Sequence, residues 1–226
     1  MNRKKLFHKN RFLKKMVAVL IVVSVVLLGA LDVYAQQPYS NAEFAVSLDI
    51  ISYNSPVLTS DGSGNGHSFI VVHNFNSYAI QVGHMRVPSN ESVTVSVFDN
   101  RANHKGVWYN IEGYHASAIE NASPARLSTG LSQEELNTLN SYINNYDYYS
   151  LASNNCSQFS KRCWNAVSDV KLSGGIPTLL RNSIVSHGGS TSGVDVPNKS
   201  ISSIAYQTST SVKSDSSGAY DSSSSS

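Results

Sequence analysis

The sequence predicts an α+β domain in which an antiparallel sheet packs against helices. Short apolar runs with the length of strands lie between residues 44 and 114. Two segments with apolar residues at helical spacing follow, at 133–144 and 156–167. Residues 36–206 form one domain of roughly 160–170 residues, which is long enough for a single hydrophobic core without support from a metal or a disulfide.

Residues 1–35 have the pattern of a signal peptide. A basic stretch precedes an apolar run at 16–31, and small residues at 33–35 stand where a signal peptidase cleaves. We therefore expect a protein that is secreted or held in the cell envelope. An uncleaved anchor is the alternative, because about 16 apolar residues are only slightly fewer than the roughly 17–25 that span a bilayer. Membrane contact is expected only in that case.

The composition of the remaining chain argues against nucleic acid as a partner. Seven of the 17 basic residues but only one of the 15 acidic residues lie in 1–35, so the rest of the chain has an excess of acidic side chains. No cluster of Lys and Arg with interleaved aromatic residues remains there. Residues 207–226 have almost no apolar content, and we expect them to form a disordered, serine-rich tail.

The predicted strands are 44–51, 67–73, 78–84, 92–98 and 107–114. The segment 67–73 is apolar on both faces, which is typical of a buried strand. The polar residues 74–77 that follow it indicate a turn, so 67–73 and 78–84 are expected to form a hairpin.

Three helices are predicted from their first residues. Ser132 and Glu135 have the spacing of a capping box at the start of 133–144. Either Asn154 or Asn155 is expected to cap the helix 156–167. Pro177 is expected to open a short third helix that ends at Ser183.

The two cysteines are predicted to be free thiols. Cys156 and Cys163 are seven residues apart on one predicted helix, about 10.5 Å along its axis. A disulfide requires Cα atoms within roughly 7 Å of each other. A free thiol in an exported protein requires an explanation, and we interpret Cys163 as a packing residue and Cys156 as a reactive one.

Cys156 and His67 are the candidate nucleophile and base. Cys156 begins a helix, whose free N–H groups and dipole stabilise a thiolate, and a nearby protonated imidazole can lower a thiol pKa from about 8.5 to roughly 3.5–7.5. In the predicted hairpin His67 faces His84, which would orient its ring; a shift of one residue would turn His84 to the other face. The N–H of Cys156 and the side chain of Asn154 are the expected oxyanion donors. Taken alone, a Cys at a helix start is more often a small buried hydrophobe.

Metal and serine mechanisms have no support in the sequence. There is no His-Glu-x-x-His motif, and the two cysteines do not stand in zinc-binding pairs. There is also no Gly-x-Ser-x-Gly elbow. No metal and no cofactor are expected.

Two motifs, Gly-His-Ser-Phe-Ile-Val-Val at 66–72 and Tyr-Ser-Leu-Ala-Ser-Asn-Asn-Cys-Ser-Gln-Phe at 149–159, resemble a known superfamily. They are similar to the His strand and Cys helix of the circularly permuted papain-like hydrolases, relatives of the NlpC-type cell-wall peptidases and of the lecithin:retinol acyltransferase group. The resemblance covers about 66–167, and the asparagines before the Cys are its most specific part. It implies an antiparallel sheet that carries the His strand and packs against the Cys helix.

The resemblance also implies roles for individual residues. Cys156 would attack an acyl carbon, His67 would be the base, and a polar residue on the next strand, His84, would orient the imidazole. The chain departs from the pattern in the long segment between His67 and Cys156. Glu112, within that segment, is the alternative orienting group or a substrate-pocket residue, although an exposed strand residue without a role is the simplest interpretation of it.

The functional hypothesis is an exported cysteine hydrolase, of the peptidase or amidase type, that cleaves amide bonds through a Cys156 thioester. Peptides of the cell wall are its most accessible substrates outside the membrane. One alternative is an acyltransferase or phospholipase-like enzyme with a lipid acyl donor on the same fold. Another is a secreted binding protein without catalytic activity.

Overall fold

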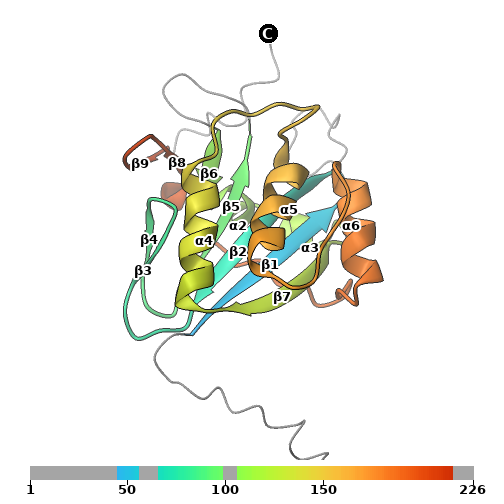
Figure 1. The fold of residues 1–226 in the computed structure, drawn as a ribbon, viewed down its shortest axis with the longest axis horizontal. Helices are drawn as coiled ribbons and strands as arrows, with labels where there is room; N and C mark the ends of the chain where they lie inside the picture. The colour runs from blue at the N-terminus through green and yellow to red at the C-terminus, as the bar shows by residue number, and fades with distance from the viewer. Residues whose placement is uncertain (1–44, 56–65, 99–105, 216–226) are drawn as a thin grey trace, which may run out of the picture. The chain divides into compact units, whose positions relative to one another are not determined.

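The computed structural model describes residues 45–55, 66–98 and 106–215 of the chain (Figure 1). They belong to one compact unit, Glu43–Ser226. The signal peptide predicted at 1–35 lies outside the described residues. Within the described part, no helix has both the length and the apolar content needed to cross a membrane.

The described residues confirm the α+β class, with a large antiparallel sheet and several helices. The strands are β1 (Val46–Tyr53), β2 (His67–Asn74), β3 (Ile80–Val82), β4 (Met85–Val87), β5 (Ser92–Val97), β6 (Val107–Tyr109), β7 (Ala125–Leu131), β8 (Ala205–Gln207) and β9 (Val212–Ser214). Seven of them form one sheet in the order β7-β1-β2-β5-β6-β8-β9, and β3 pairs with β4 in a second sheet. The helices are α2 (Ile111–Tyr114), α3 (Ala116–Glu120), α4 (Gln133–Asn144), α5 (Cys156–Val167) and α6 (Pro177–Ser186), with a 3-10 helix, η1, at Ile201–Ser203.

Helices cover both faces of the large sheet, as Figure 1 shows, with α4, α5 and α6 on one face and α2 and α3 on the other. Successive side chains of a strand point to opposite faces. Accordingly, Ile70 and Val72 of β2 pack in a cluster with α4, α5 and α6. Phe69 and Val71 pack in a second cluster with α3. All four are fully buried, which explains why this strand is apolar on both faces.

The predicted hairpin between 67–73 and 78–84 is wrong. β2 pairs with β1 and β5, whereas β3 pairs with β4 across a tight turn at Gly83 and His84. Gly83 has a φ of 57°, a left-handed conformation that glycine adopts without strain. The side-chain amide of Asn74 donates to the backbone carbonyls of Tyr78, Val87 and Pro88 at 2.8, 3.2 and 2.8 Å. The chain after β2 therefore leaves the sheet instead of folding back along it.

The segment 107–114, predicted as one strand, is strand β6 followed by helix α2. Asn110 lies between them with a φ of 64°, a left-handed conformation that ends the extended chain. Its side-chain amide donates to the carbonyl of Ser203 at 3.0 Å, which holds the bend. Glu112 consequently lies on α2 and is fully buried, so its interpretation as an exposed strand residue is wrong.

The predicted helices are confirmed. At the start of α4 the Ser132 hydroxyl accepts the Glu135 N–H at 3.2 Å, and the Glu135 carboxylate accepts the Ser132 N–H at 2.7 Å. The helix α5 begins at Cys156, as its cap predicts. The helix α6 begins at Pro177 and continues past the predicted end to Ser186.

Two edge strands have no counterpart in the sequence analysis. Strand β7 pairs with β1 at one edge of the sheet, and β9 pairs with β8 at the other. Because β9 lies within 207–226, the disordered tail predicted there is wrong up to residue 215, and 216–226 lie outside the described residues. An edge strand is held by backbone hydrogen bonds, and partly buried Val212 adds contact with the core.

Candidate active site

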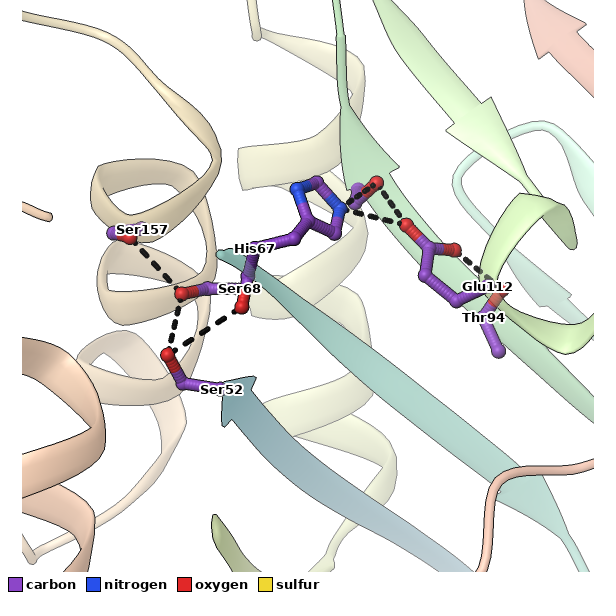
Figure 2. Close-up of polar contacts among 7 residues, drawn as sticks. Ser52, His67, Ser68, Thr94, Glu112 and Ser157 are labelled. Carbon is purple, nitrogen blue, oxygen red and sulfur yellow. Dashed lines mark hydrogen bonds and ion pairs between the residues drawn. The ribbon is translucent and has the colours of Figure 1, made fainter. Parts of the chain in front are cut away.

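Three buried serines join the start of β2 to the start of α5. Ser68 follows His67 and Ser157 follows Cys156, and the hydroxyls of these two serines lie 2.9 Å apart. The Ser68 hydroxyl also lies 2.8 Å from that of Ser52 on β1 (Figure 2). All three serines have no exposed surface. The serine chain fixes the first turn of α5 against the sheet, and with it the position of Cys156 relative to His67.

Asn155 organises the N-terminus of α5. Its side-chain oxygen accepts the Gln158 N–H at 3.1 Å, as in a helix cap. Its side-chain nitrogen donates to the carbonyls of Leu151 and Gly175, both at 2.9 Å, so two loops are held at the same helix end. Cys156 is the first residue of the helix, where free N–H groups and the helix dipole favour a negative charge.

His67 links Cys156 to a buried carboxylate. Its Nε2 lies 2.9 Å from Glu112 Oε1 and 3.1 Å from Ser96 Oγ. The imidazole is also hydrogen-bonded to the Cys156 thiol. Since Nε2 faces Glu112 and Ser96, Nδ1 is the ring nitrogen left for the thiol. In such a chain the carboxylate fixes the orientation and tautomer of the imidazole, and the imidazole activates the thiol.

Glu112 is held by hydroxyl donors from the neighbouring strand β5. The Thr94 hydroxyl donates to Glu112 Oε2 at 2.7 Å, and the Ser96 hydroxyl donates to Oε1. Figure 2 shows these contacts on the side of His67 away from the three serines. Hydrogen bonds to a carboxylate favour its charged form. The network therefore keeps Glu112 ionised although the residue is completely buried.

The surroundings of the thiol and the imidazole favour an ion pair. Burial alone would raise the pKa of Cys156, but the charge and hydrogen bond of His67 outweigh it and lower that pKa below its ordinary value. The backbone N–H of Ser68 and the hydroxyl of Ser157 act in the same direction. Burial alone would lower the pKa of His67, but Cys156 and Glu112 raise it to about 9. Both shifts favour the thiolate–imidazolium pair over the neutral thiol and the neutral imidazole.

Cys163, seven residues further along α5, lacks these features. Both cysteines are free, as predicted. Burial raises the pKa of Cys163 well above its ordinary value. Cys163 also lines a cavity of 310 Å³ between α4 and α5, to which Cys156 does not contribute. A single helix thus carries one activated thiol and one inert thiol.

The structure does not bring His84 to His67. His84 lies in the turn between β3 and β4, where its backbone N–H approaches the Tyr109 hydroxyl at 3.3 Å and Gln207 Oε1 at 3.2 Å. The register that placed His84 opposite His67 is wrong because His67 begins β2 of the large sheet, whereas His84 lies in the turn of the separate β3–β4 sheet. Glu112, the alternative orienting group, contacts the imidazole instead.

The side-chain amide of Asn154 forms hydrogen bonds with Tyr148 and Arg162. Its side-chain nitrogen donates to the carbonyl of Tyr148 at 2.5 Å, and its side-chain oxygen accepts from Arg162 at 2.7 Å. With both ends of the amide engaged, the predicted role of Asn154 as an oxyanion donor does not fit its position. The backbone N–H of Cys156 retains the place that the sequence predicts for it, at the first turn of the helix.

The hydroxyl residues of the site were not predicted from the sequence. Thr94 and Ser96 alternate along β5 and therefore point to the same face as His67, and this polar alternation was the available signal. Ser68 and Ser157 carry a second signal, because each directly follows one of the two candidate residues, His67 and Cys156.

The described residues contain no group of three or more His, Cys, Asp or Glu side chains placed to hold a metal ion. The arrangement that the structure does bring together is a carboxylate, an imidazole and a thiol in hydrogen-bonded series. Comparison of the chain with models of protein families, with curated proteins and with solved structures gave no match, so the geometry of this site is the basis for its interpretation.

Proposed function

We propose that this chain is a cysteine hydrolase of the circularly permuted papain-like class, with Cys156 as nucleophile and His67 as base. The observation that carries the proposal is the hydrogen-bonded series from Glu112 through His67 to Cys156 at the start of a helix. The antiparallel sheet that bears His67 and packs against the Cys156 helix agrees with the arrangement in that class.

The reaction follows from the charges at the site. The Cys156 thiolate attacks an acyl carbon, a C–S bond forms, and the π electrons of the carbonyl move to its oxygen. When this intermediate collapses, the bond to the leaving group breaks and the leaving group takes the proton of the His67 imidazolium. Neutral His67 then removes a proton from water, which attacks the thioester and releases the acid and the thiolate. Glu112 holds the imidazole in one orientation throughout.

The substrate class proposed is an amide, and peptides of the cell wall are the substrates that an exported enzyme would meet. A leaving amine must be protonated as the C–N bond breaks, and the pKa of about 9 at His67 keeps that proton available at neutral pH. The proposal includes export through residues 1–35 and the secreted or cell-envelope location expected from them.

A lipid acyl donor is the second candidate, and exposed apolar side chains favour it. Leu151 is 78 % exposed, and Ile176 and Leu179 are about half exposed. The Asn155 side chain at the start of α5 donates to the carbonyls of Leu151 and Gly175. Ile176 directly follows Gly175, so these exposed apolar side chains are near the start of α5. Purified protein should be assayed on wall peptides and on phospholipid vesicles. Turnover of phospholipid esters without turnover of wall peptides would identify a lipid as the acyl donor and exclude the wall-peptide substrate.

The thioester intermediate tests the proposal directly. Purified protein is mixed with p-nitrophenyl acetate, quenched in acid, digested and examined by mass spectrometry. We expect one acetyl group on the peptide that contains Cys156 and none on Cys163, because the pKa of Cys156 is lowered whereas burial raises that of Cys163. A folded protein that shows no acetyl group on Cys156 would contradict the proposal.

A further inference from the structure

Tyr53 lies beside the reactive pair but has no role in the chemistry described above. It is the last residue of β1 and stands directly opposite His67 on β2. Directly opposed residues of an antiparallel pair point to the same face of the sheet, with Cβ atoms about 4.5–5.5 Å apart. The two ring centroids are 6.3 Å apart, and Tyr53 has no exposed surface.

The hydroxyl of Tyr53 is a buried donor without a partner. Among the described residues no group forms a hydrogen bond with it. Buried hydroxyls are almost always paired, because leaving one unpaired destabilises the folded state. The buried Tyr109 behaves in the usual way, since its hydroxyl donates to Gln207. The unpaired hydroxyl of Tyr53 belongs to a ring beside the His67 imidazole, so it remains available to donate a hydrogen bond to a bound substrate.

The charges near Tyr53 keep its hydroxyl protonated. Burial, then the negative charge of Glu112, then that of Cys156 raise the pKa of Tyr53 far above its ordinary value. Both charges act on the phenol, so the hydroxyl lies in the field of the thiolate and of the carboxylate. A neutral phenol in this place can donate a hydrogen bond and does not compete with His67 as a base.

We propose that Tyr53 is a catalytic residue whose hydroxyl donates a hydrogen bond to the oxyanion formed when Cys156 attacks the acyl carbon. This proposal rests on the proposed function and gives Tyr53 the place that the sequence predicts for Asn154. The N–H of Cys156, at the first turn of α5, is the second donor.

The step balances without any further reactant. As the C–S bond forms, the carbonyl π electrons move to the oxygen, and the phenol keeps its proton while it donates to that oxygen. When the carbonyl re-forms, the leaving group departs with the proton of His67. The same hydrogen bond forms again when water attacks the thioester.

Two reagents that share the Cys156 nucleophile separate this role from packing. Iodoacetamide reacts at a saturated carbon and forms no oxyanion, whereas p-nitrophenyl acetate reacts through one. In Tyr53→Phe we expect acylation of Cys156 to slow by about 10²- to 10³-fold. Alkylation of Cys156 should stay within about twofold, because thiolate formation does not use the phenol. The midpoint of thermal unfolding should be unchanged or higher, because an unpaired buried hydroxyl has been removed.

Tyr109→Phe is the matched control. It removes the same atom from another buried tyrosine, one whose hydroxyl is already paired with Gln207. We expect a lower unfolding midpoint and no change in the ratio of acylation to alkylation. If Tyr53→Phe retains the wild-type acylation rate, or if both of its rates fall together, Tyr53 is not an oxyanion donor.

If the wild-type protein is alkylated but never acylated at Cys156, the proposed function is wrong, and so is this role of Tyr53. If Tyr53→Phe does not fold, 2,3-difluorotyrosine at position 53 supplies a more acidic phenol with little change in size. It should raise the ratio of acylation to alkylation, and an unchanged ratio would contradict the proposal.

Discussion

Replacing Cys156 with Ala is expected to lower the release of p-nitrophenol from p-nitrophenyl acetate by at least about 10³-fold, to the rate without enzyme. The reason is that no other thiol is activated in the described part of the chain. Burial raises the pKa of Cys163, and no imidazole lies among the influences on its ionisation. The measurement is the initial rate at neutral pH, with the thermal unfolding midpoint as a check of folding.

Cys163→Ala is the matched control for the nucleophile. It removes the other thiol of the same helix and should retain the wild-type rate, with a loss of about 1 kcal/mol or more in unfolding free energy for a side chain only 1 % exposed. If neither the wild type nor Cys156→Ala exceeds the rate without enzyme, the chain is a binding protein on this fold. If both exceed it equally, another residue is the nucleophile.

Replacing Glu112 with Gln is expected to lower the same activity by about 10²- to 10⁴-fold. Glutamine has nearly the same shape but carries no charge, so His67 loses the group that orients it and helps to raise its pKa. A less basic His67 stabilises the Cys156 thiolate less. The pH at which alkylation of Cys156 reaches half of its maximum should therefore move upward.

His84→Ala separates the two candidates for the orienting group. His84 lies in the β3–β4 turn and is bound there through its backbone, so its side chain should be replaceable without change in activity. Glu112→Asp keeps the charge but shortens the side chain, and its activity should lie between those of Glu112→Gln and the wild type. Wild-type activity in Glu112→Gln together with a large loss in His84→Ala would reverse the assignment.

The contribution of Glu112 to stability has a definite sign. The pKa of Glu112 is lowered on folding, mainly by His67 against the effect of burial. A lowered pKa stabilises the folded state above the unfolded value of about 4.3, and this contribution disappears as the pH falls through the lower folded value. Below that pH a wild-type protein and Glu112→Gln should approach each other in unfolding free energy.

The sequence predicts best those elements whose ends are encoded locally. The capping box of Ser132 and Glu135 and the cap at Asn155 each require only a few neighbouring residues, and both helices begin where these residues predict. Cys156 and His67 were found for the same reason, since each is the first residue of its element.

The remaining features depend on contacts between distant segments. The hairpin prediction failed because Asn74 binds carbonyls beyond β3 and the turn forms at Gly83. Glu112 reaches His67 only because β5 lies next to β2 and α2 packs against β5, an order that no local pattern states. Tyr53 lies opposite His67 because of the register between β1 and β2. No turn signal in the sequence between these two strands would predict this register.

The pH dependence of iodoacetamide labelling at the two cysteines tests the central claim, that His67 holds Cys156 as a thiolate. Labelling of Cys156 should be the faster of the two and should reach its plateau below the ordinary thiol pKa of about 8.5. Labelling of Cys163 should be slow and should rise about tenfold per pH unit through the same range, as for an unactivated thiol. Parallel pH curves for the two cysteines, both rising through pH of about 8.5, would contradict the account.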